Sequence, residues 1–379
     1  MADALGLFLT ISGLLYLLVL VFVASLGQII LHLRDRKRTE PEVWPTVSVL
    51  VSGKNEEAVF ATCINSLINL DYPKEKLQII IVDDQSTDNT AKVIETAIEG
   101  HDHVQTLNTK DYDTHLKAKA RGISFAAKHA TGEWLFITDA DAEVHPLWLK
   151  KMLTGTSKKT GTIAGMMTIK ENNLVSTLEK MSWGYTIPFA FGAAGYGMDF
   201  ICVGPNMAIR RSIYEESGGL EKAEFNVAED LAIFMMSANA GYKALAHNNP
   251  ETTVRMFPLE TFQQLLSQQR RWIRGGYEQS WEYSIGLSVV FGFGFLFVIA
   301  IILGLFINPV AATGALLLKL VAESSVFITE KIVFREKRFL RYLPVIYFYL
   351  FFIFLFLPIS FVINRSVSWQ GEGYKIDYK

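Results

Sequence analysis

Hydrophobic residues are unevenly distributed along this chain of 379 residues. They fill residues 5–33 and most of 283–363, whereas the part between them alternates short apolar runs with polar stretches. The first run is long enough to cross a hydrocarbon core of about 30 Å. The pattern predicts an N-terminal transmembrane helix (1–33), a globular middle domain (34–257), an interfacial helix (258–282) and C-terminal transmembrane helices (283–363).

Basic residues next to the first apolar run predict which side of the membrane each part faces. Four of them, between Arg34 and Arg38, follow the run, and no Lys or Arg precedes it. Positive charges gather on the cytoplasmic side of membrane spans. The N-terminus is therefore expected outside and the middle domain in the cytoplasm, in a multi-pass protein of a bacterial-type inner (plasma) membrane.

Three further spans are predicted near the C-terminus, at about 283–307, 309–329 and 340–363. Five basic residues between Lys331 and Arg341 mark a cytoplasmic loop before the last span, so the tail, residues 364–379, would lie outside. Lys319 and Glu323, four residues apart, share one helix face within the second of these spans. At membrane depth they either face the bundle interior and serve a function, or they pair with each other or extend their charged ends to the membrane surface.

The middle domain repeats a strand-then-helix pattern. Buried strands of a parallel sheet are predicted from its apolar, β-branched runs at 46–51, 77–82, near Val104 and at 134–138. Stretches with helical spacing lie between these runs. The first helix is expected to begin at Asn55, because an Asn side chain at the N-cap accepts a bond from a free backbone N–H. Alternation of this kind predicts an α/β fold.

Acidic residues directly follow two of the predicted strands. Asp83 and Asp84 follow one, and Asp139 and Asp141 follow another. Ligands of open α/β sheets bind beyond the carboxyl ends of the strands, and carboxylate oxygens suit Mg²⁺ or Mn²⁺. A lone Asp-x-Asp pair, however, is also common in solvated turns. The chain has no Gly-x-Gly-x-x-Gly after its first strand and no Gly-x-x-x-x-Gly-Lys-Ser/Thr, so dinucleotide oxidoreduction and Walker-type ATP hydrolysis lose their main support.

Charge and metal-ligand content narrow the function further. The formal net charge is −2, which indicates no broad basic surface for nucleic acid. Neither the two cysteines nor the seven histidines show the spacing of metal ligands. A nucleotide site in this chain would therefore be built from acids, with a metal carrying the phosphates.

Two polar motifs nearer the C-terminus have both a structural and a functional interpretation. Glu229 and Asp230 begin a helical segment, where the helix dipole favours acids. Gln268, Arg271 and Trp272 share one face of the predicted interfacial helix. Arg and Trp are typical of the headgroup level of a membrane, but Arg also pairs with phosphate and Trp offers a platform for a sugar ring. Both interpretations of this helix can hold together.

Five motifs, in this order, resemble those of the membrane-bound family-2 glycosyltransferases with a GT-A fold. They are Val82-Asp83-Asp84, Asp139-Ala-Asp141, Gly204-Pro-Asn206, Glu229-Asp230 and Gln268-Gln-Arg-Arg271-Trp272. The resemblance covers roughly residues 46–276, and the flanking spans match it as well. It implies a GT-A domain that takes a sugar from a nucleotide-sugar donor, with a UDP-sugar expected first.

The resemblance also implies a role for each matching residue. Asp230 would be the general base, with Glu229 beside it, in a reaction that inverts the anomeric configuration. The donor site would consist of Asp84, Asp83, Asp139, Lys54, Glu56, Gln268, Arg271 and Trp272. The metal, Mg²⁺ or Mn²⁺, would be bound by Asp141 and Asp139. The acceptor site would consist of Gly204, Asn206 and Trp272.

A membrane lipid is the expected acceptor. The chain resembles ceramide, diacylglycerol and carotenoid glucosyltransferases in size and in its Trp369-x-Gly-x-x-Tyr374 tail. Such a tail would fit better on the cytoplasmic side, whereas the predicted number of spans places it outside. A processive β-polysaccharide synthase, which shares the Gln-x-x-Arg-Trp motif, is one alternative. A non-catalytic membrane scaffold or nucleotide-sugar sensor is another, but Asp139, Asp141 and Asp230 are all present.

Overall fold

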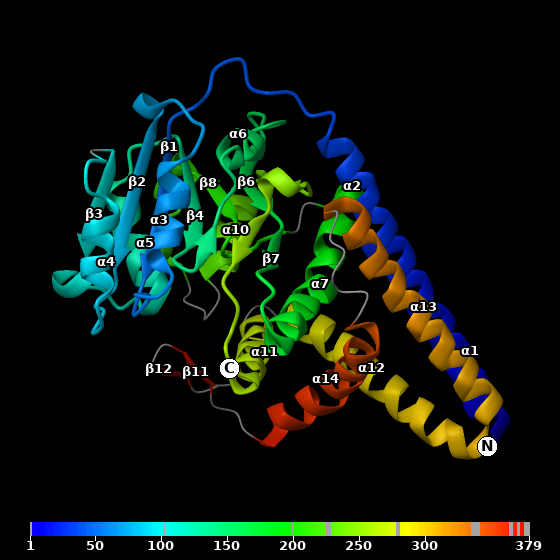
Figure 1. Cartoon of the computed structure of the whole chain (residues 1–379). Coiled ribbons are helices and arrows are strands. Elements are labelled where there is room, and N and C mark those ends of the chain that lie inside the picture. Colours follow the sequence, from blue (N-terminus) through cyan, green and yellow to red (C-terminus); the bar gives the residue numbers. More distant parts are fainter. Residues whose placement is uncertain are drawn as a thin grey trace. The chain divides into compact units, whose positions relative to one another are not determined.

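The chain is divided into two compact units (Figure 1). The computed structural model describes residues 2–101, 103–198, 201–223, 229–277, 281–334, 342–363, 367–369 and 372–374. The helical unit consists of Met1–Ile30, Glu171–Ala193 and Pro258–Lys379, and the sheet unit of Leu31–Lys170 and Ala194–Phe257.

A seven-stranded sheet forms the centre of the sheet unit, in the order β3-β2-β1-β4-β8-β6-β9 (Figure 1). Its strands are β1 (Val47–Gly53), β2 (Leu77–Asp83), β3 (Val104–Asn108), β4 (Trp134–Asp139), β6 (Thr160–Gly165), β8 (Met207–Arg210) and β9 (Lys243–His247). β8 is antiparallel to β4 and β6, and the other neighbours are parallel. The four predicted parallel strands are thus confirmed. β1 is buried on both faces, as its mostly apolar composition indicates.

A second sheet of three strands, in the order β5-β10-β7, continues the chain beyond the Asp-x-Asp pair. Its strands are β5 (Ala142–Glu143), β7 (Met167–Ile169) and β10 (Val254–Met256). The Phe257 N–H, just past β10, donates to the carbonyl of Asp141 at 2.8 Å. The backbone on the far side of Asp139 is therefore held by a sheet rather than left as a loose turn.

Helices cover the large sheet. α5 (Ala118–His129) packs against β1 and β2, and α10 (Glu229–Asn239) packs against β6, β8 and β9. The remaining helices of this unit are α3 (Phe60–Ile68), α4 (Thr90–Ala97), α6 (Trp148–Met152), α8 (Arg211–Glu216) and α9 (Gly219–Lys222). Leu50, Ile123 and Ile233 lie in the core between the sheet and α5 and α10, each with no exposed surface.

The first helix of this unit begins later than predicted. α3 starts at Phe60, and Asn55 is not its N-cap. Asn55 has a φ of 59°, in the left-handed region, which a right-handed helix excludes. Its side-chain Oδ1 instead accepts a bond from the Thr87 N–H at 2.8 Å. The prediction was wrong because Asn55 bonds across to the loop after β2 rather than along its own chain.

The helical unit begins with α1 (Ala2–Leu18), a π-helical segment (Val19–Leu26) and α2 (Gly27–Asp35), which follow one another without a break. α13 (Pro309–Phe334) runs alongside α1 (Figure 1). The other elements are α7 (Leu174–Gly195), α11 (Phe262–Tyr277), α12 (Trp281–Ile307), α14 (Leu343–Ile363) and the hairpin β11 (Val367–Trp369) and β12 (Glu372–Tyr374). α7 includes most of a Pro-containing segment, residues 183–198, for which the sequence predicts an interfacial element.

Two helices in the described part of the chain are long and apolar enough to cross a membrane. They are Ala2–Asp35 and Pro309–Phe334. Shorter apolar helices occupy Gly292–Ile307 and Leu343–Phe356. The number of spans, expected to be four, stays a prediction. The predicted basic loop is described only at its start, since residues 335–341 lie outside the described residues.

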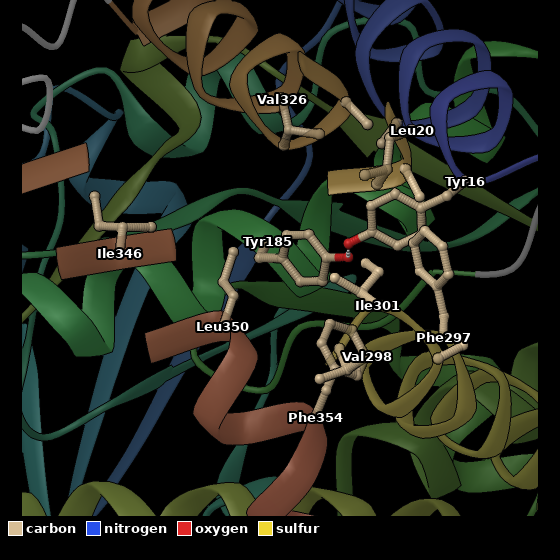
Figure 2. Close-up of a cluster of buried hydrophobic side chains, with 14 of the residues drawn as sticks. Tyr16, Leu20, Tyr185, Phe297, Val298, Ile301, Val326, Ile346, Leu350 and Phe354 are labelled. Carbon is tan, nitrogen blue, oxygen red and sulfur yellow. Dashed lines mark hydrogen bonds between the residues drawn. The ribbon is translucent and has the colours of Figure 1, made fainter. Parts of the chain in front are cut away.

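The core of the helical unit contains a polar cluster among apolar side chains (Figure 2). The hydroxyls of Tyr16 on α1 and Tyr185 on α7 face each other and are hydrogen-bonded. The Tyr16 hydroxyl also donates to Glu323 Oε1 at 2.9 Å, and Glu323 forms an ion pair with Lys319. The Lys319 and Glu323 side chains are only 1% and 0% exposed. Lys319 and Glu323 therefore pair with each other and also face the interior of the helical unit. A function for the pair stays a prediction.

Breaking this ion pair is expected to destabilise the helical unit. Glu323→Leu leaves the Lys319 ammonium buried without its carboxylate, which costs about 3–5 kcal/mol. Replacing both residues, as Lys319→Met with Glu323→Leu, removes the two charges together and should cost much less. Unfolding by SDS in mixed micelles measures both free energies. A double variant as unstable as the single one would contradict this account.

Candidate active site

Three carboxylates crowd the carboxyl edge of β1 and β4. Asp139 ends β4 and lies opposite Ser52 of the parallel strand β1. Asp141 lies in the following turn, and Glu56 in the loop after β1. Burial, together with the charges of Asp139 and Glu56, raises the pKa of Asp141 well above its usual range. Burial, Asp139 and Asp88 raise the pKa of Glu56 to about 7. The ionised forms of these acids are therefore disfavoured at this edge unless a cation lies beside them.

One ammonium group bridges this cluster to a second pair of acids. Lys119 on α5 forms ion pairs with Asp139 and with Glu229, the latter at 2.9 Å. Its Nζ also donates to the Gly204 carbonyl at 3.3 Å. Burial would lower the pKa of Lys119, but the two carboxylates raise it well above its usual range, so the group stays charged. The structure thus brings the predicted metal-binding and catalytic acids together around a single buried cation.

Asp230 is held in a defined orientation at the start of α10. Its Oδ2 accepts a bond from the Gly204 N–H at 3.0 Å, and its Oδ1 accepts one from the Leu231 N–H at 2.8 Å. Burial and the neighbouring Glu229 raise the pKa of Asp230 to about 6, against the opposing effect of Lys119. A carboxylate with a pKa close to neutrality is suited to general base catalysis. Gly204, predicted in the acceptor site, therefore lies directly at the predicted base.

The acids after β2 are engaged with protein partners. Asp84 is fully buried and accepts two bonds from Arg121, at 2.6 and 3.0 Å, and one from the Thr109 hydroxyl at 2.6 Å. Asp83 accepts from the Asn108 amide at 2.8 Å and from the Ser86 N–H at 3.0 Å. These bonds hold the loops at the carboxyl ends of β2 and β3. A nucleobase would therefore meet Asp84 only beside the guanidinium of Arg121.

The Asn206 side chain holds the fold together. It has no exposed surface, and its amide nitrogen donates to the carbonyls of Met166 and Thr252 at 2.6 and 2.7 Å. Its Oδ1 accepts from the Trp148 indole at 2.9 Å. All the donors of its amide are thus used. The acceptor site proposed below does not include this side chain.

The Gln-x-x-Arg-Trp motif lies in the helical unit, on α11. Gln268 Nε2 donates to Glu179 Oε1 on α7 at 3.2 Å. The Trp272 ring lies against that of Trp183, also on α7, with their centroids 3.8 Å apart. Of the predicted donor-site residues, Arg271 shares this helix, whereas Lys54 lies in the loop after β1 in the sheet unit.

Two site residues, Lys119 and Arg121, are missing from the sequence-based prediction. The available signal was the alternation of basic residues in Lys117-Ala-Lys119-Ala-Arg121, just before the strand that ends in Asp139. Such a run on a helix is usually a solvated face, and nothing local shows that two of its members are buried against acids. Their partners come from β2, β4 and α10.

The residues at this edge fit a divalent cation. Among the described residues, no group of three or more His, Cys, Asp or Glu side chains is arranged to hold a metal by itself. Magnesium, however, is commonly bound through one or two carboxylates together with substrate phosphates. Asp139 and Asp141 supply two carboxylates, and the raised pKa of Asp141 reports the negative charge that a cation would neutralise.

Comparisons with known proteins agree with this fold. The chain is 29% identical over 245 residues to a probable glycosyltransferase, YdaM, of Bacillus subtilis, covering 61% of this chain and 55% of that protein. It is 26% identical over 276 residues to a beta-monoglucosyldiacylglycerol synthase of Nostoc, covering 69% and 55%. A mannosyltransferase from Pyrobaculum calidifontis, solved with GDP-Man and Mn²⁺, shares the fold with a TM-score of 0.54 at 19% identity, over 92% of this chain and 96% of that one.

The class follows from these comparisons: the protein is a glycosyltransferase with a GT-A fold. The chain belongs to glycosyl transferase family 21, whose model matches residues 15–379. The predicted enzyme class and fold are confirmed, and the non-catalytic scaffold or sensor loses its support. The chain spans about half the length of the curated relatives that it matches, 55% in both cases.

The burial of Asn206 generates a prediction. Asn206→Ala leaves the Trp148 indole and two carbonyls without their partner, and each unsatisfied buried group costs about 1–3 kcal/mol. The melting temperature of the purified protein should therefore fall clearly. Asn69→Ala is the matched control, because Asn69 is an exposed Asn whose amide bonds only to a carbonyl of its own helix. An Asn206→Ala protein that melts like this control would show that the side chain is not structural.

Proposed function

We propose that this protein is a membrane-anchored, metal-dependent, inverting glycosyltransferase. It would move a sugar from a nucleotide-sugar donor, a UDP-sugar first of all, to a lipid hydroxyl at the cytoplasmic face of the membrane. The observation that carries the proposal is the Lys119 bridge. Lys119 contacts Asp139 and Glu229 at once. This supports assigning Asp139 and its neighbour Asp141 to the metal and diphosphate, and Glu229 and its neighbour Asp230 to proton transfer.

The donor side of the site consists of the carboxylates at β1 and β4. A divalent cation held by Asp141 and Asp139 would neutralise the diphosphate as it becomes the leaving group. Asp139 is shared with Lys119, which supplies a second positive charge at the same place. Glu56 and Lys54, in the loop after β1, complete this side. The charges of the site thus favour the developing diphosphate over the intact donor.

The acceptor side of the site consists of Asp230 and the backbone of Gly204. The acceptor hydroxyl would give its proton to the Asp230 carboxylate while its oxygen attacks the anomeric carbon. The bond from that carbon to the diphosphate oxygen breaks at the same time, and the nucleoside diphosphate leaves with the electron pair. Attack from the side opposite the leaving group inverts the configuration, so an α-linked donor yields a β-linked product. No covalent glycosyl-enzyme intermediate is needed.

A lipid acceptor is supported by two findings. One curated relative is a beta-monoglucosyldiacylglycerol synthase, and two helices of this chain have the length and composition of membrane spans. An enzyme anchored beside the lipid surface meets acceptors that are confined to that surface. With a soluble acceptor, membrane anchoring by the apolar helices would not bring enzyme and acceptor together.

The tail supports a particular topology. β11 lies against α11, the helix with the Gln-x-x-Arg-Trp motif. Two segments in contact lie on the same side of a membrane, so the chain between them crosses it an even number of times. We therefore propose two crossings after α11 rather than the expected three, with the tail on the cytoplasmic side, where a lipid glycosyltransferase would use it.

Product analysis tests the proposed function. Purified protein in detergent is given bacterial lipid extract, Mn²⁺ and a panel of labelled nucleotide sugars. Label should enter the organic phase with one donor, and both EDTA and Asp230→Asn should abolish this transfer. Label found only in high-mass aqueous material would identify a processive polysaccharide synthase instead. Transfer that persists in EDTA would remove the metal from the mechanism.

The raised pKa of Asp230 gives a second prediction. A base acts only when deprotonated, so kcat/KM should fall about tenfold per pH unit below the pKa of Asp230, which is about 6. Glu56, with a pKa of about 7, titrates nearby. The control is therefore Glu56→Gln, whose kcat/KM should still begin to fall at about pH 6. If kcat/KM falls only near pH 4, a group other than Asp230 controls the pH dependence. The same holds if the fall shifts in the Glu56→Gln protein.

A further inference from the structure

We infer that Glu179 on α7 is a positioning residue that orients the Gln268 amide so that its Oε1 accepts a hydrogen bond from a substrate hydroxyl. Trp183, one turn further along α7, positions the Trp272 ring through a ring contact. The inference rests on the proposed function and on the sequence-based expectation that Gln268 and Trp272 contribute to the substrate site. All four residues lie in the helical unit.

The contacts between α7 and α11 match in register. Glu179 and Trp183 are four residues apart on α7, and Gln268 and Trp272 are four residues apart on α11. Residues with this spacing lie on the same helix face. The first pair forms a hydrogen bond of 3.2 Å, and the second brings two indole rings to 3.8 Å between centroids. Two successive turns of α7 therefore hold the two ends of the motif.

The Glu179 carboxylate also holds the segment that leads into α11. Its Oε2 accepts a bond from the Leu259 N–H at 2.8 Å, while its Oε1 accepts from Gln268 Nε2. The residue is 2% exposed. A buried carboxylate needs such bonds, because an unsatisfied charge in an apolar surrounding is costly. One side chain thus positions both the approach to α11 and the first residue of the motif.

The chemistry of this contact decides which end of the amide is offered to a ligand. Both oxygens of Glu179 accept from N–H groups in this structure, so the nitrogen of the Gln268 amide faces Glu179. The oxygen is then directed elsewhere. Gln268 Oε1 is buried and accepts no bond from the described residues. A buried acceptor without a partner is costly, and sugar hydroxyls are donors that would satisfy it.

A reciprocal exchange of the two side chains tests the inference. Glu179→Gln removes the acceptor-only partner and lets the amide turn over, and Gln268→Glu sets two carboxylates against each other. Each single variant should lower kcat/KM for the donor about tenfold or more, as expected for a hydrogen bond to a charged group. The double variant restores an amide-to-carboxylate bond and leaves an oxygen free for the hydroxyl. It should return to within about threefold of the original protein.

Three further measurements separate this role from a purely structural one. Thr186→Ala, on the exposed side of α7, should leave activity unchanged, and Trp183→Phe should retain more activity than Trp183→Ala. The melting temperature of Glu179→Gln should stay close to that of the original protein while its KM for the donor rises. Loss of activity that only follows a falling melting temperature would overturn the inference, as would a double variant no better than the product of the singles.

Failure of the inference and failure of the proposed function give different results. Gln268→Leu with full transfer activity would remove the motif from the site and overturn the inference, while the proposed function would stand. No transfer by the original protein from any donor in the panel would overturn the proposed function. An inactive Gln268→Leu beside a fully active Glu179→Gln would overturn only the positioning role of Glu179.

Discussion

The active site depends on the burial of several carboxylates at one edge of a sheet. Like charges in a partly buried place raise one another's pKa, and the fold tolerates them only where a cation is shared. Lys119 is that cation in this structure, in contact with Asp139 and Glu229 at once. A diphosphate and its metal would enter a site whose charges are already arranged in opposed pairs. Preorganisation of this kind favours the transition state, because the protein need not reorganise during the reaction.

The helical unit also buries charged side chains, here among apolar ones. Its ion pair, Lys319 with Glu323, is joined to Tyr16 and Tyr185 by hydrogen bonds, so Glu323 Oε1 meets both the Lys319 ammonium and the Tyr16 hydroxyl. α7 takes part in this cluster through Tyr185 and holds α11 through Glu179. The same helix therefore links the packing of the apolar helices to the Gln-x-x-Arg-Trp motif, for which we infer a contact with a substrate hydroxyl.

Local sequence pattern was a good guide to the elements of the sheet unit. The strands β1, β2 and β4 were predictable because each is a mostly apolar run, and acids stand at the ends of β2 and β4. The start of α3 was not predictable, because Asn55 satisfies its side chain on the loop of Thr87 rather than on its own helix. Capping rules describe bonds along the chain and do not foresee competition from a loop that the sheet brings alongside.

The sequence by itself determined the class of fold, the order of the motifs and the identity of the acids at the strand ends. The tertiary structure decided which of those acids share a cation, which of them are bonded to protein groups, and that the Asn206 side chain is structural. The physical reason is that hydrophobic period and chain order are local properties. The partners of Lys119, Asp84 and Gln268 lie on other elements, and only the packing of the whole unit selects them.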